Sequence, residues 1–301
     1  MDSGSIVPAD PVDCPKGQTI YDTVVFNAGC SSASDTLACL RSLPYETYLK
    51  AATSVPAFSD YQSVALSYLP RPDGVALTES PEFLAEQGKF AQVPFIVGDQ
   101  EDEGTLFSLS QSNISTTDEL VTYLSTIFFH DATREQVQDF VNVYPDDPSQ
   151  GSPFGTGPLN NIYPQYKRLA AILGDATFTL TRRVFLTIAN QVYPLLPTYS
   201  YLATYGYGTP ILGTFHASDI PRAYGEVQDL PAQTIMDYYS SFLYYGDPNV
   251  GLASLTLPTW PTWSAGQQLL DFGETTNSLT PDDFRAEQFQ FLLANATSFH
   301  I

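Results

Sequence analysis

The sequence predicts an α/β fold in which helices flank a mostly parallel sheet. Segments with strand character alternate with helical segments, and the helical segments are the more numerous. Hydrophobic residues occupy 43% of the 301 positions, which is enough for a large buried core. The chain contains neither an internal repeat nor a low-complexity linker, so residues 1–301 are expected to form a single domain.

The N-terminal part of the chain is predicted to be a proline-rich loop followed by short helices. The first three helices are expected over 18–28, 35–43 and 45–52. Pro44 precedes the third, and proline is favoured at helix starts because its missing N–H would be unpaired there anyway. Ser80 at the N-cap and Pro81 at the first position predict another short helix, which ends at Gly88.

Three segments have the composition of strands. An apolar run starts near Val93 and ends at Gly98, so we expect a buried strand there. A helix, a short loop and a buried strand together form the unit of a mostly parallel sheet. The segment 197–205 alternates in polarity and is rich in tyrosine, which predicts a second strand, and 269–272 is the last.

The remaining helices are predicted from start signals and apolar periodicity. Thr116 and Glu119 have the spacing of a capping box, which predicts a helix that runs to about Phe129. Further helices are expected over 133–143, 164–173, 176–192 and 233–245, with a loop over 150–161. Residues 280–283 are expected to cap a final helix that reaches about Ala294.

Charge and composition argue against several classes of function. A formal net charge of −21 would repel phosphate backbones, so nucleic-acid binding is not expected. No stretch of the sequence approaches the ~20 consecutive apolar residues of a membrane-spanning helix. The first residues lack the basic start and the apolar region of a signal peptide. Low lysine content, many tyrosines and the acidic balance are typical of secreted proteins.

Cysteines and sequons point in the same direction. Cys30 and Cys39 lie nine positions apart between two predicted helices, where they could form a small disulfide or remain buried thiols. Cys14 is left over. Asn113 and Asn295 begin Asn-x-Ser/Thr sequons, which would be glycosylation acceptors in a secreted protein.

The sequence lacks the common cofactor motifs. It has no Gly-x-x-x-x-Gly-Lys run and no Gly-x-Gly-x-x-Gly after a strand, so no nucleotide cofactor is expected. The histidines and cysteines show no metal-ligand spacing, so no metal is expected. His300 should be exposed, and His130 should end an apolar helix. His216 follows a predicted strand, where it is either catalytic or a hydrogen-bonded loop histidine.

Three acids, Glu101, Asp102 and Glu103, follow the first buried strand directly. They could form a solvated loop, or one of them could share a catalytic triad with His216. In such a triad the acid orients the imidazole, and the imidazole removes the proton of a serine hydroxyl. An acid followed later by a histidine is the order found in α/β-hydrolases.

Several segments resemble the type-B carboxylesterases, the cholinesterase and lipase family, and secreted fungal lipases in particular. The family's triad-acid segment is similar to PRPDGVAL…PEFLAEQGKFAQVPFIVGDQEDEGTLF, and its histidine loop to ILGTFHASDIP. Its cysteine loop is similar to NAGCSSASDTLACLRSL, and later landmarks to FLYYGDPN and PTWPTWS. The resemblance runs over essentially the whole chain in the family's order, and it implies the α/β-hydrolase fold.

The resemblance also implies roles for individual residues. Glu103 matches the triad acid and His216 matches the triad base. The other two acids of that loop are expected to be solvated neighbours. Leu106 and Phe107 match positions that line the acyl-binding region in the lipases.

The cysteines agree with the family pattern, whereas the nucleophile motif departs from it. Cys30 and Cys39 match a family disulfide. No Gly-x-Ser-x-Gly occurs, because the run 151–155 has its serine at the wrong position. The start, MDSGSIVP, resembles the strand and turn downstream of the nucleophile. Residues 1–301 are therefore expected to be a fragment, a partial α/β-hydrolase domain without the N-terminal region that bears the serine and any signal peptide.

The expected function is carboxylic ester hydrolysis in lipid degradation, with an ester or lipid substrate and no cofactor. This chain would supply the acid and base of a Ser-Glu-His triad and would be inactive by itself. The alternative is a non-catalytic, cholinesterase-like binding module, and a third reading is an unrelated secreted α/β protein. The presence of both the acid and the histidine favours the enzyme over the binding module.

Overall fold

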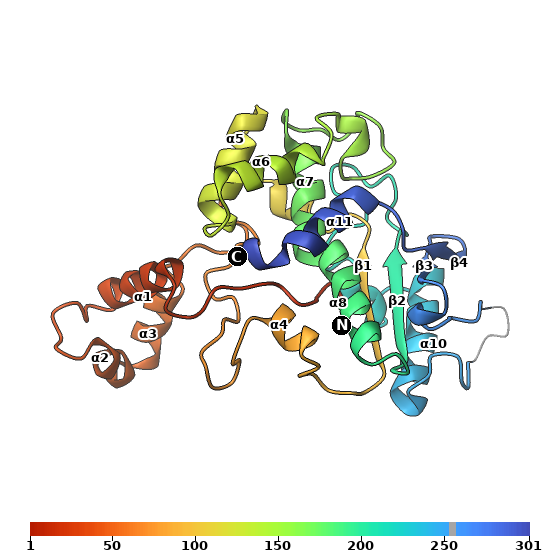
Figure 1. Cartoon of the computed structure of the whole chain (residues 1–301), viewed down its shortest axis with the longest axis horizontal. Helices are drawn as coiled ribbons and strands as arrows, with labels where there is room; N and C mark the ends of the chain where they lie inside the picture. The colour runs from red at the N-terminus through yellow and green to blue at the C-terminus, as the bar shows by residue number, and fades with distance from the viewer. Residues whose placement is uncertain (253–256) are drawn as a thin grey trace.

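The computed structural model describes residues 1–252 and 257–301. Within these residues a four-stranded sheet has the order β1-β2-β3-β4, and helices lie on both of its faces (Figure 1). The strands are β1 Phe95–Gln100, β2 Thr198–Ala203, β3 Gln268–Phe272 and β4 Asn277–Pro281. The first three run parallel, and β4 is antiparallel to β3. The α/β class and the mostly parallel sheet are thus confirmed, whereas β4 was not predicted.

The first strand is longer than the sequence predicted. β1 continues past Gly98 to Gln100, and Gly98 pairs with Tyr201 of β2. A Cβ on Gly98 would lie 2.2 Å from Cδ1 of the Tyr201 ring. Gly98 therefore lies within the strand. A glycine is needed there because a side chain would collide with the Tyr201 ring of the neighbouring strand.

The helices follow the predicted order closely. Their bounds are α1 Pro15–Asn27, α2 Thr36–Ser42, α3 Tyr45–Ala52, α4 Pro81–Glu86, α5 Thr117–Tyr123, α6 Arg134–Asn142, α7 Tyr166–Gly174, α8 Leu180–Val192, α9 Ile220–Ala223, α10 Leu230–Tyr245 and α11 Ala286–Asn295. A π-helical turn over Asp175–Thr179 joins α7 to α8, so the two helices predicted there form one continuous helical segment.

Both faces of the sheet are covered, which explains why its parallel strands are almost entirely buried. On one face, Leu186 of α8 lies in a cluster with Val97 of β1 and Leu202 of β2. On the other face, Ile235 and Tyr238 of α10 join a cluster with the side chains of β2 and β3. The sheet is therefore the middle of three layers (Figure 1).

Of two predicted helix N-caps, one caps its helix through its side chain and the other does not. The capping box of α5 is confirmed, since Thr116 Oγ1 accepts from the Glu119 N–H at 3.2 Å and Glu119 Oε2 accepts from the Thr116 N–H at 3.0 Å. Ser80 occupies the N-cap of α4, but its side chain does not cap the helix. Its Oγ donates instead to Glu82 Oε2 at 2.5 Å and accepts from the Ala9 N–H at 2.9 Å.

The predicted start of the last helix is wrong. Thr280 and Pro281 end strand β4, and α11 begins only at Ala286. Asp282 does not cap that helix, because its carboxylate pairs with two buried guanidinium groups of α8. Arg285, in the left-handed conformation with φ 50°, makes the turn into α11 instead.

A separate lobe is built from α1, α2 and α3, and it lies beside the sheet layers (Figure 1). The predicted disulfide between Cys30 and Cys39 is confirmed, with their Cα atoms 5.8 Å apart. It closes the loop between α1 and α2 over a small core that includes Val24 and Leu40. Cys14 is a buried free thiol at the N-cap of α1.

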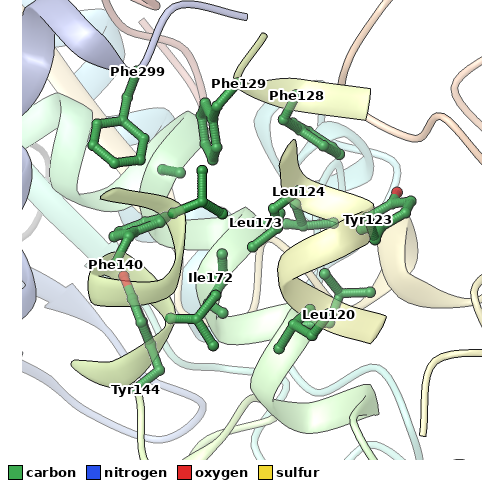
Figure 2. Close-up of a cluster of buried hydrophobic side chains, with 14 of the residues drawn as sticks. Leu120, Tyr123, Leu124, Phe128, Phe129, Phe140, Tyr144, Ile172, Leu173 and Phe299 are labelled. Atoms are coloured by element: carbon green, nitrogen blue, oxygen red, sulfur yellow. The ribbon is translucent and has the colours of Figure 1, made fainter. Parts of the chain in front are cut away.

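The helices α5, α6 and α7 enclose a cluster of aromatic and aliphatic side chains near the carboxyl ends of β1 and β2 (Figure 1). Figure 2 shows its members Leu120, Tyr123, Leu124, Phe128, Phe129, Phe140, Tyr144, Ile172, Leu173 and Phe299. Phe107, which follows the acid-rich loop after β1, also belongs to this cluster. The loop is therefore packed against this helical layer.

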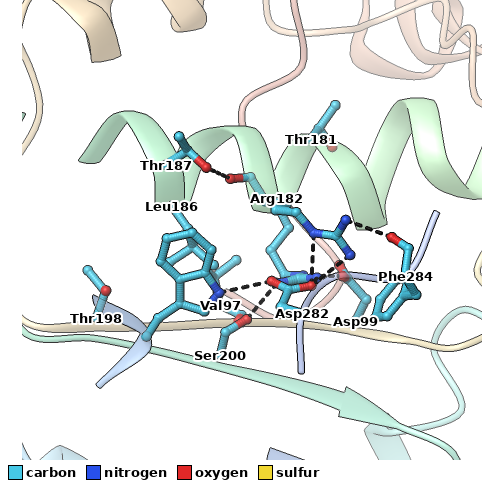
Figure 3. A network of polar contacts seen from close by, with 12 residues as sticks. Val97, Asp99, Thr181, Arg182, Leu186, Thr187, Thr198, Ser200, Asp282 and Phe284 are labelled. Atoms are coloured by element: carbon cyan, nitrogen blue, oxygen red, sulfur yellow. Dashed lines mark hydrogen bonds and ion pairs between the residues drawn. The ribbon is translucent and has the colours of Figure 1, made fainter. Parts of the chain in front are cut away.

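A buried polar network ties α8 to the sheet (Figure 3). Arg182 donates from Nε to Asp99 Oδ2 at 2.6 Å, from Nη1 to Ser200 Oγ at 2.9 Å, and through both Nη atoms to Asp282. Ser200 Oγ donates in turn to the Val97 carbonyl at 2.7 Å. The network links β1, β2 and the segment before α11.

In residues 1–252 and 257–301 no helix has the length and apolarity needed to span a membrane. The same residues contain no group of three or more His, Cys, Asp or Glu side chains arranged to hold a metal ion.

Candidate active site

The carboxyl end of β1 delivers a buried acid. Glu103 follows the strand by three residues and is 1% exposed. Its Oε1 accepts from the Gln100 N–H at 2.7 Å and from Ser3 Oγ. Its Oε2 faces Nδ1 of His216 at 2.6 Å. Hydrogen bonds to both oxygens therefore hold the carboxylate in one orientation.

The structure brings His216 to this acid from the loop between β2 and α9. Because Glu103 can only accept while ionised, the contact places the ring proton on Nδ1. Nε2 makes no hydrogen bond to any described residue, and the side chain is 28% exposed. The ring also contacts Phe107 and Phe178, each with its centroid 5.0 Å away. The imidazole is thus held on one side and open on the other.

Ser3 is a residue of this site that the sequence did not single out. It lies on the open side of β1, where its N–H donates to the Gly98 carbonyl at 2.9 Å. Its backbone has φ 51°, and its side chain is directed at Glu103. The segment MDSGSIVP resembles a family motif, but nothing local marks which of its two serines reaches an acid.

Two expectations about the neighbouring acids are wrong. Asp102 is 1% exposed and accepts hydrogen bonds from two other loops, so it is not solvated. Glu101 is half-buried, and burial together with the charge of Asp102 raises the pKa of Glu101 to about 8. The sheet end and the surrounding loops enclose the whole acid cluster, which a sequence window cannot reveal.

Leu106 and Phe107, three and four positions after Glu103, differ in their surroundings. Phe107 is buried and stacks on Phe178 with a centroid distance of 5.7 Å and an interplanar angle of 14°. Leu106 is half-buried in the same short 3₁₀ turn. Phe107 therefore packs directly behind the imidazole of His216, and Leu106 lies beside it in the chain.

Other candidate residues lie apart from this pair. His300, expected to be exposed, is half-buried, with Nε2 2.9 Å from Glu82 Oε1 and Nδ1 3.3 Å from Asp10 Oδ1. His130 is exposed. Asn113 is exposed, and Asn295 at the end of α11 is half-buried; as glycosylation acceptors both stay predictions.

Two cavities lie against α1 rather than at the acid–histidine pair. One, of about 900 Å³, is lined mainly by apolar side chains of the α1–α3 lobe, including Ile20, Val24 and Leu40. The other, of about 650 Å³, lies between α1 and His130. Neither cavity is lined by Glu103 or His216.

Comparison with known proteins identifies close relatives. The chain matches the carboxylesterase family over residues 3–292. It is 56% identical to "Secreted lipase 1" of Botryotinia fuckeliana over 100% of this chain and 52% of that protein. It is 52% identical to "Secreted triacylglycerol lipase LIP1" of Gibberella zeae over 98% of this chain and 50% of that protein. The chain thus spans about half the length of these relatives.

A solved structure shows the same fold. The crystal structure of Aspergillus niger EstA superimposes on the whole of this chain and on 58% of its own, with a TM-score of 0.79 and 22% sequence identity. The open sheet flanked by helices is accordingly that of an α/β-hydrolase. Because the family match extends over nearly all of its residues, the chain belongs to the carboxylesterase family.

Proposed function

We propose that this chain is the C-terminal part of a secreted carboxylic ester hydrolase and supplies the acid and base of a Ser-Glu-His triad. The observation that carries the proposal is the 2.6 Å contact between the buried Glu103 carboxylate and Nδ1 of His216. A buried acid aligned on one imidazole nitrogen, with the other nitrogen open, is the arrangement that general-base catalysis requires. A non-catalytic binding module would have no need of this alignment.

The geometry supports the following roles. Nε2 of His216 takes the proton of a serine hydroxyl as the serine oxygen attacks the ester carbonyl. Glu103, bonded to Nδ1–H, stabilises the imidazolium that results. The imidazolium then gives its proton to the leaving alcohol, and an acyl-serine forms. A water molecule, deprotonated by the same Nε2, releases the carboxylic acid and restores the serine.

The serine would come from a region outside this chain, since residues 1–301 contain no Gly-x-Ser-x-Gly. We therefore expect the 301-residue chain by itself to be inactive. The names of the relatives, a secreted lipase and a secreted triacylglycerol lipase, support an ester or lipid substrate. Leu106 and Phe107, next to the acid and histidine, are proposed to contact the acyl chain of that substrate.

The test joins this chain to the nucleophile-bearing region of its own gene and measures hydrolysis of p-nitrophenyl butyrate. Glu103→Gln and His216→Ala should each lower kcat by about 10³-fold or more, as removal of a triad member does. Glu101→Gln and His130→Ala are matched controls and should remain close to the parent. Near-parent activity in Glu103→Gln or His216→Ala would refute the assignment, and turnover by the 301-residue chain alone would refute the missing nucleophile.

A further inference from the structure

The acid next to Glu103 connects three segments of the chain. Oδ1 of Asp102 accepts from Ser152 Oγ at 2.7 Å and from the Phe154 N–H at 2.8 Å. Oδ2 accepts from the Thr214 N–H at 3.0 Å. The Asp102 backbone N–H donates to the Thr214 carbonyl at 2.9 Å. Asp102 thus bonds both the backbone N–H and the backbone carbonyl of Thr214 and connects this residue to the 152–154 loop.

These contacts lie immediately beside the proposed triad. Glu103 follows Asp102 in the chain, and His216 follows Thr214 by two residues. Two consecutive acids therefore bind the same loop: Asp102 bonds the backbone of Thr214, and Glu103 bonds the imidazole of His216. We propose that Asp102 is a positioning residue that holds the histidine loop so that Nδ1 of His216 meets Glu103. This inference rests on the proposed function.

The site is built for a carboxylate at position 102. Three donors converge on its two oxygens, and an ionised carboxylate accepts all of them, whereas an amide would turn an N–H toward one of these donors. Burial raises the pKa of Asp102, while the hydrogen bonds from Phe154, Ser152 and Thr214 act against that rise. Each oxygen of this buried carboxylate therefore accepts at least one hydrogen bond.

The histidine loop is shaped around this carboxylate. Gly213 has φ +60°, and a Cβ there would lie 2.0 Å from Asp102 Oδ2. No other residue could bring the backbone so close, since a side chain would collide with the acid and the conformation favours glycine. The loop and the acid are therefore fitted to each other rather than placed in incidental contact.

Two further hydrogen bonds hold the histidine loop just upstream of Gly213. Thr105 Oγ1 donates to the Leu212 carbonyl at 2.7 Å, and Tyr166 Oη donates to the Ile211 carbonyl at 3.0 Å. These bonds do not involve the Asp102 carboxylate, so they should keep the loop in place when that carboxylate is altered. The expected result of losing that carboxylate is a loosened imidazole rather than an unfolded loop.

The variant Asp102→Asn tests the proposal, with Glu101→Gln as its matched control. Glu101 neighbours Asp102, and since burial and the charge of Asp102 raise its pKa to about 8, glutamine resembles the form of Glu101 present at neutral pH. The first measurement uses the 301-residue chain with ¹⁵N-labelled histidine. The proton between His216 Nδ1 and Glu103 should give a far-downfield resonance in the wild type and Glu101→Gln, and it should weaken or move upfield in Asp102→Asn.

The second measurement is kinetic and uses the chain joined to its nucleophile-bearing region. Asp102→Asn should lower kcat by about 100-fold, the loss expected from a small misplacement of a catalytic group, and leave KM within about threefold. If Asp102→Asn does not fold, Ser152→Ala removes one donor to the same carboxylate. It should shift the downfield resonance and kcat in the same direction by a smaller amount.

The outcomes separate this inference from the proposed function. If Asp102→Asn matches Glu101→Gln in both measurements while Glu103→Gln and His216→Ala abolish turnover, Asp102 has no positioning role and the triad stands. A wild-type resonance and kcat in a folded Ser152→Ala, when Asp102→Asn cannot be folded, would count against the positioning role as well. If Glu103→Gln and His216→Ala retain activity, the proposed function itself fails.

Discussion

Nδ1 of His216 lies 2.6 Å from Oε2 of Glu103, although 113 positions separate the two residues. The parallel pairing of β1 with β2 explains the contact, because both residues follow the carboxyl ends of adjacent strands. The pairing extends beyond the strands in an isolated parallel bridge between Asp102 and Phe215. Each partner of that bridge directly precedes one member of the pair. Its offset differs from the strand register by ten residues, so the loop after β2, together with the strand pairing, brings the imidazole to the acid.

The first prediction tests this register at Gly98. A Cβ at this position would meet the Tyr201 ring at 2.2 Å, so Gly98→Ala must push β1 away from β2. We expect a loss of about 1–3 kcal/mol in the free energy of unfolding, as for other overpacked core positions. Urea denaturation measures it.

The matched control for Gly98 is Gly266→Ala. The Cβ there would have only the flexible Gln268 side chain at 4.0 Å, so its effect should remain within about 0.5 kcal/mol. Equal stability of the two variants would show that β1 and β2 are not fixed by this close approach.

The second prediction concerns the hydroxyl behind the acid. Ser3→Ala removes the hydrogen bond that Ser3 Oγ donates to Glu103. Bonds to charged groups contribute about 1.5–3 kcal/mol, and we expect a destabilisation in that range. Ser5→Ala is the control, because among the described residues the Ser5 hydroxyl has no hydrogen-bond partner. In thermal unfolding, the Tm of Ser3→Ala should lie well below that of Ser5→Ala. The reverse order would contradict the role of Ser3.

The sequence was sufficient to predict the acid, the histidine and the order of the elements. Helix caps and apolar runs are local signals, and a parallel sheet brings the loops after its strands to one edge. This is why the acid-rich loop after β1 and His216 could be expected at the same edge of the sheet. The resemblance to the family selected Glu103 from three adjacent acids, which local patterns by themselves could not do.

The contacts that the sequence missed are tertiary. Asp102 looks like any loop acid until the 152–154 and histidine loops close around it. Asp282 has the sequence context of a helix cap, and no residue near it in the sequence indicates that it pairs with two arginines of α8. Strand β4 was missed because its residues are polar and mostly exposed and its last residue is Pro281, features typical of an edge strand.

The third prediction addresses the network in Figure 3 through Asp282. Its carboxylate accepts from Arg182, from Arg183 Nε at 2.9 Å and from Trp263 Nε1 at 2.9 Å. Asp282→Asn removes the carboxylate paired with Arg183 and leaves Arg182 with Asp99 alone, and breaking such a buried pair costs about 3–5 kcal/mol. The exposed neighbour provides the control, so Asp283→Asn should cost less than about 0.5 kcal/mol. Similar urea midpoints for the two variants would contradict a stabilising network.

The same carboxylate gives that network a pH dependence. Burial raises the pKa of Asp282, but the Arg182 and Arg183 charges and the Trp263 hydrogen bond outweigh it and lower the pKa to about 2. A lowered folded-state pKa means that the contribution is fully present above the ordinary value of 3.8 and is lost as the pH falls toward about 2. Asp282→Asn should therefore remove part of the acid sensitivity of unfolding, which Asp283→Asn should keep.

The fourth prediction has the opposite sign and concerns His300. The hydrogen bond to Glu82 raises the pKa of His300, burial opposes it, and the charges of Glu82 and Asp10 add to the rise. A raised folded-state pKa gives stability that is fully present below the ordinary value of 6.5 and is lost as the pH rises through the folded-state pKa. Since the Ile301 N–H also donates to the Pro8 carbonyl at 3.0 Å, the affected contact joins the last residues to the 8–10 segment.

His300→Gln should abolish this component, so its free energy of unfolding should fall below that of the wild type at about pH 5.5 and approach it at about pH 8.5. His130→Gln should show at least the wild-type loss of stability across this pH range, because burial lowers the pKa of His130 and its own contribution therefore has the opposite sign. Urea midpoints measured at several pH values give the comparison. If the difference in free energy of unfolding between wild type and His300→Gln stays constant with pH, the protonation of His300 does not contribute to stability. A difference that grows with pH would reverse the assigned sign.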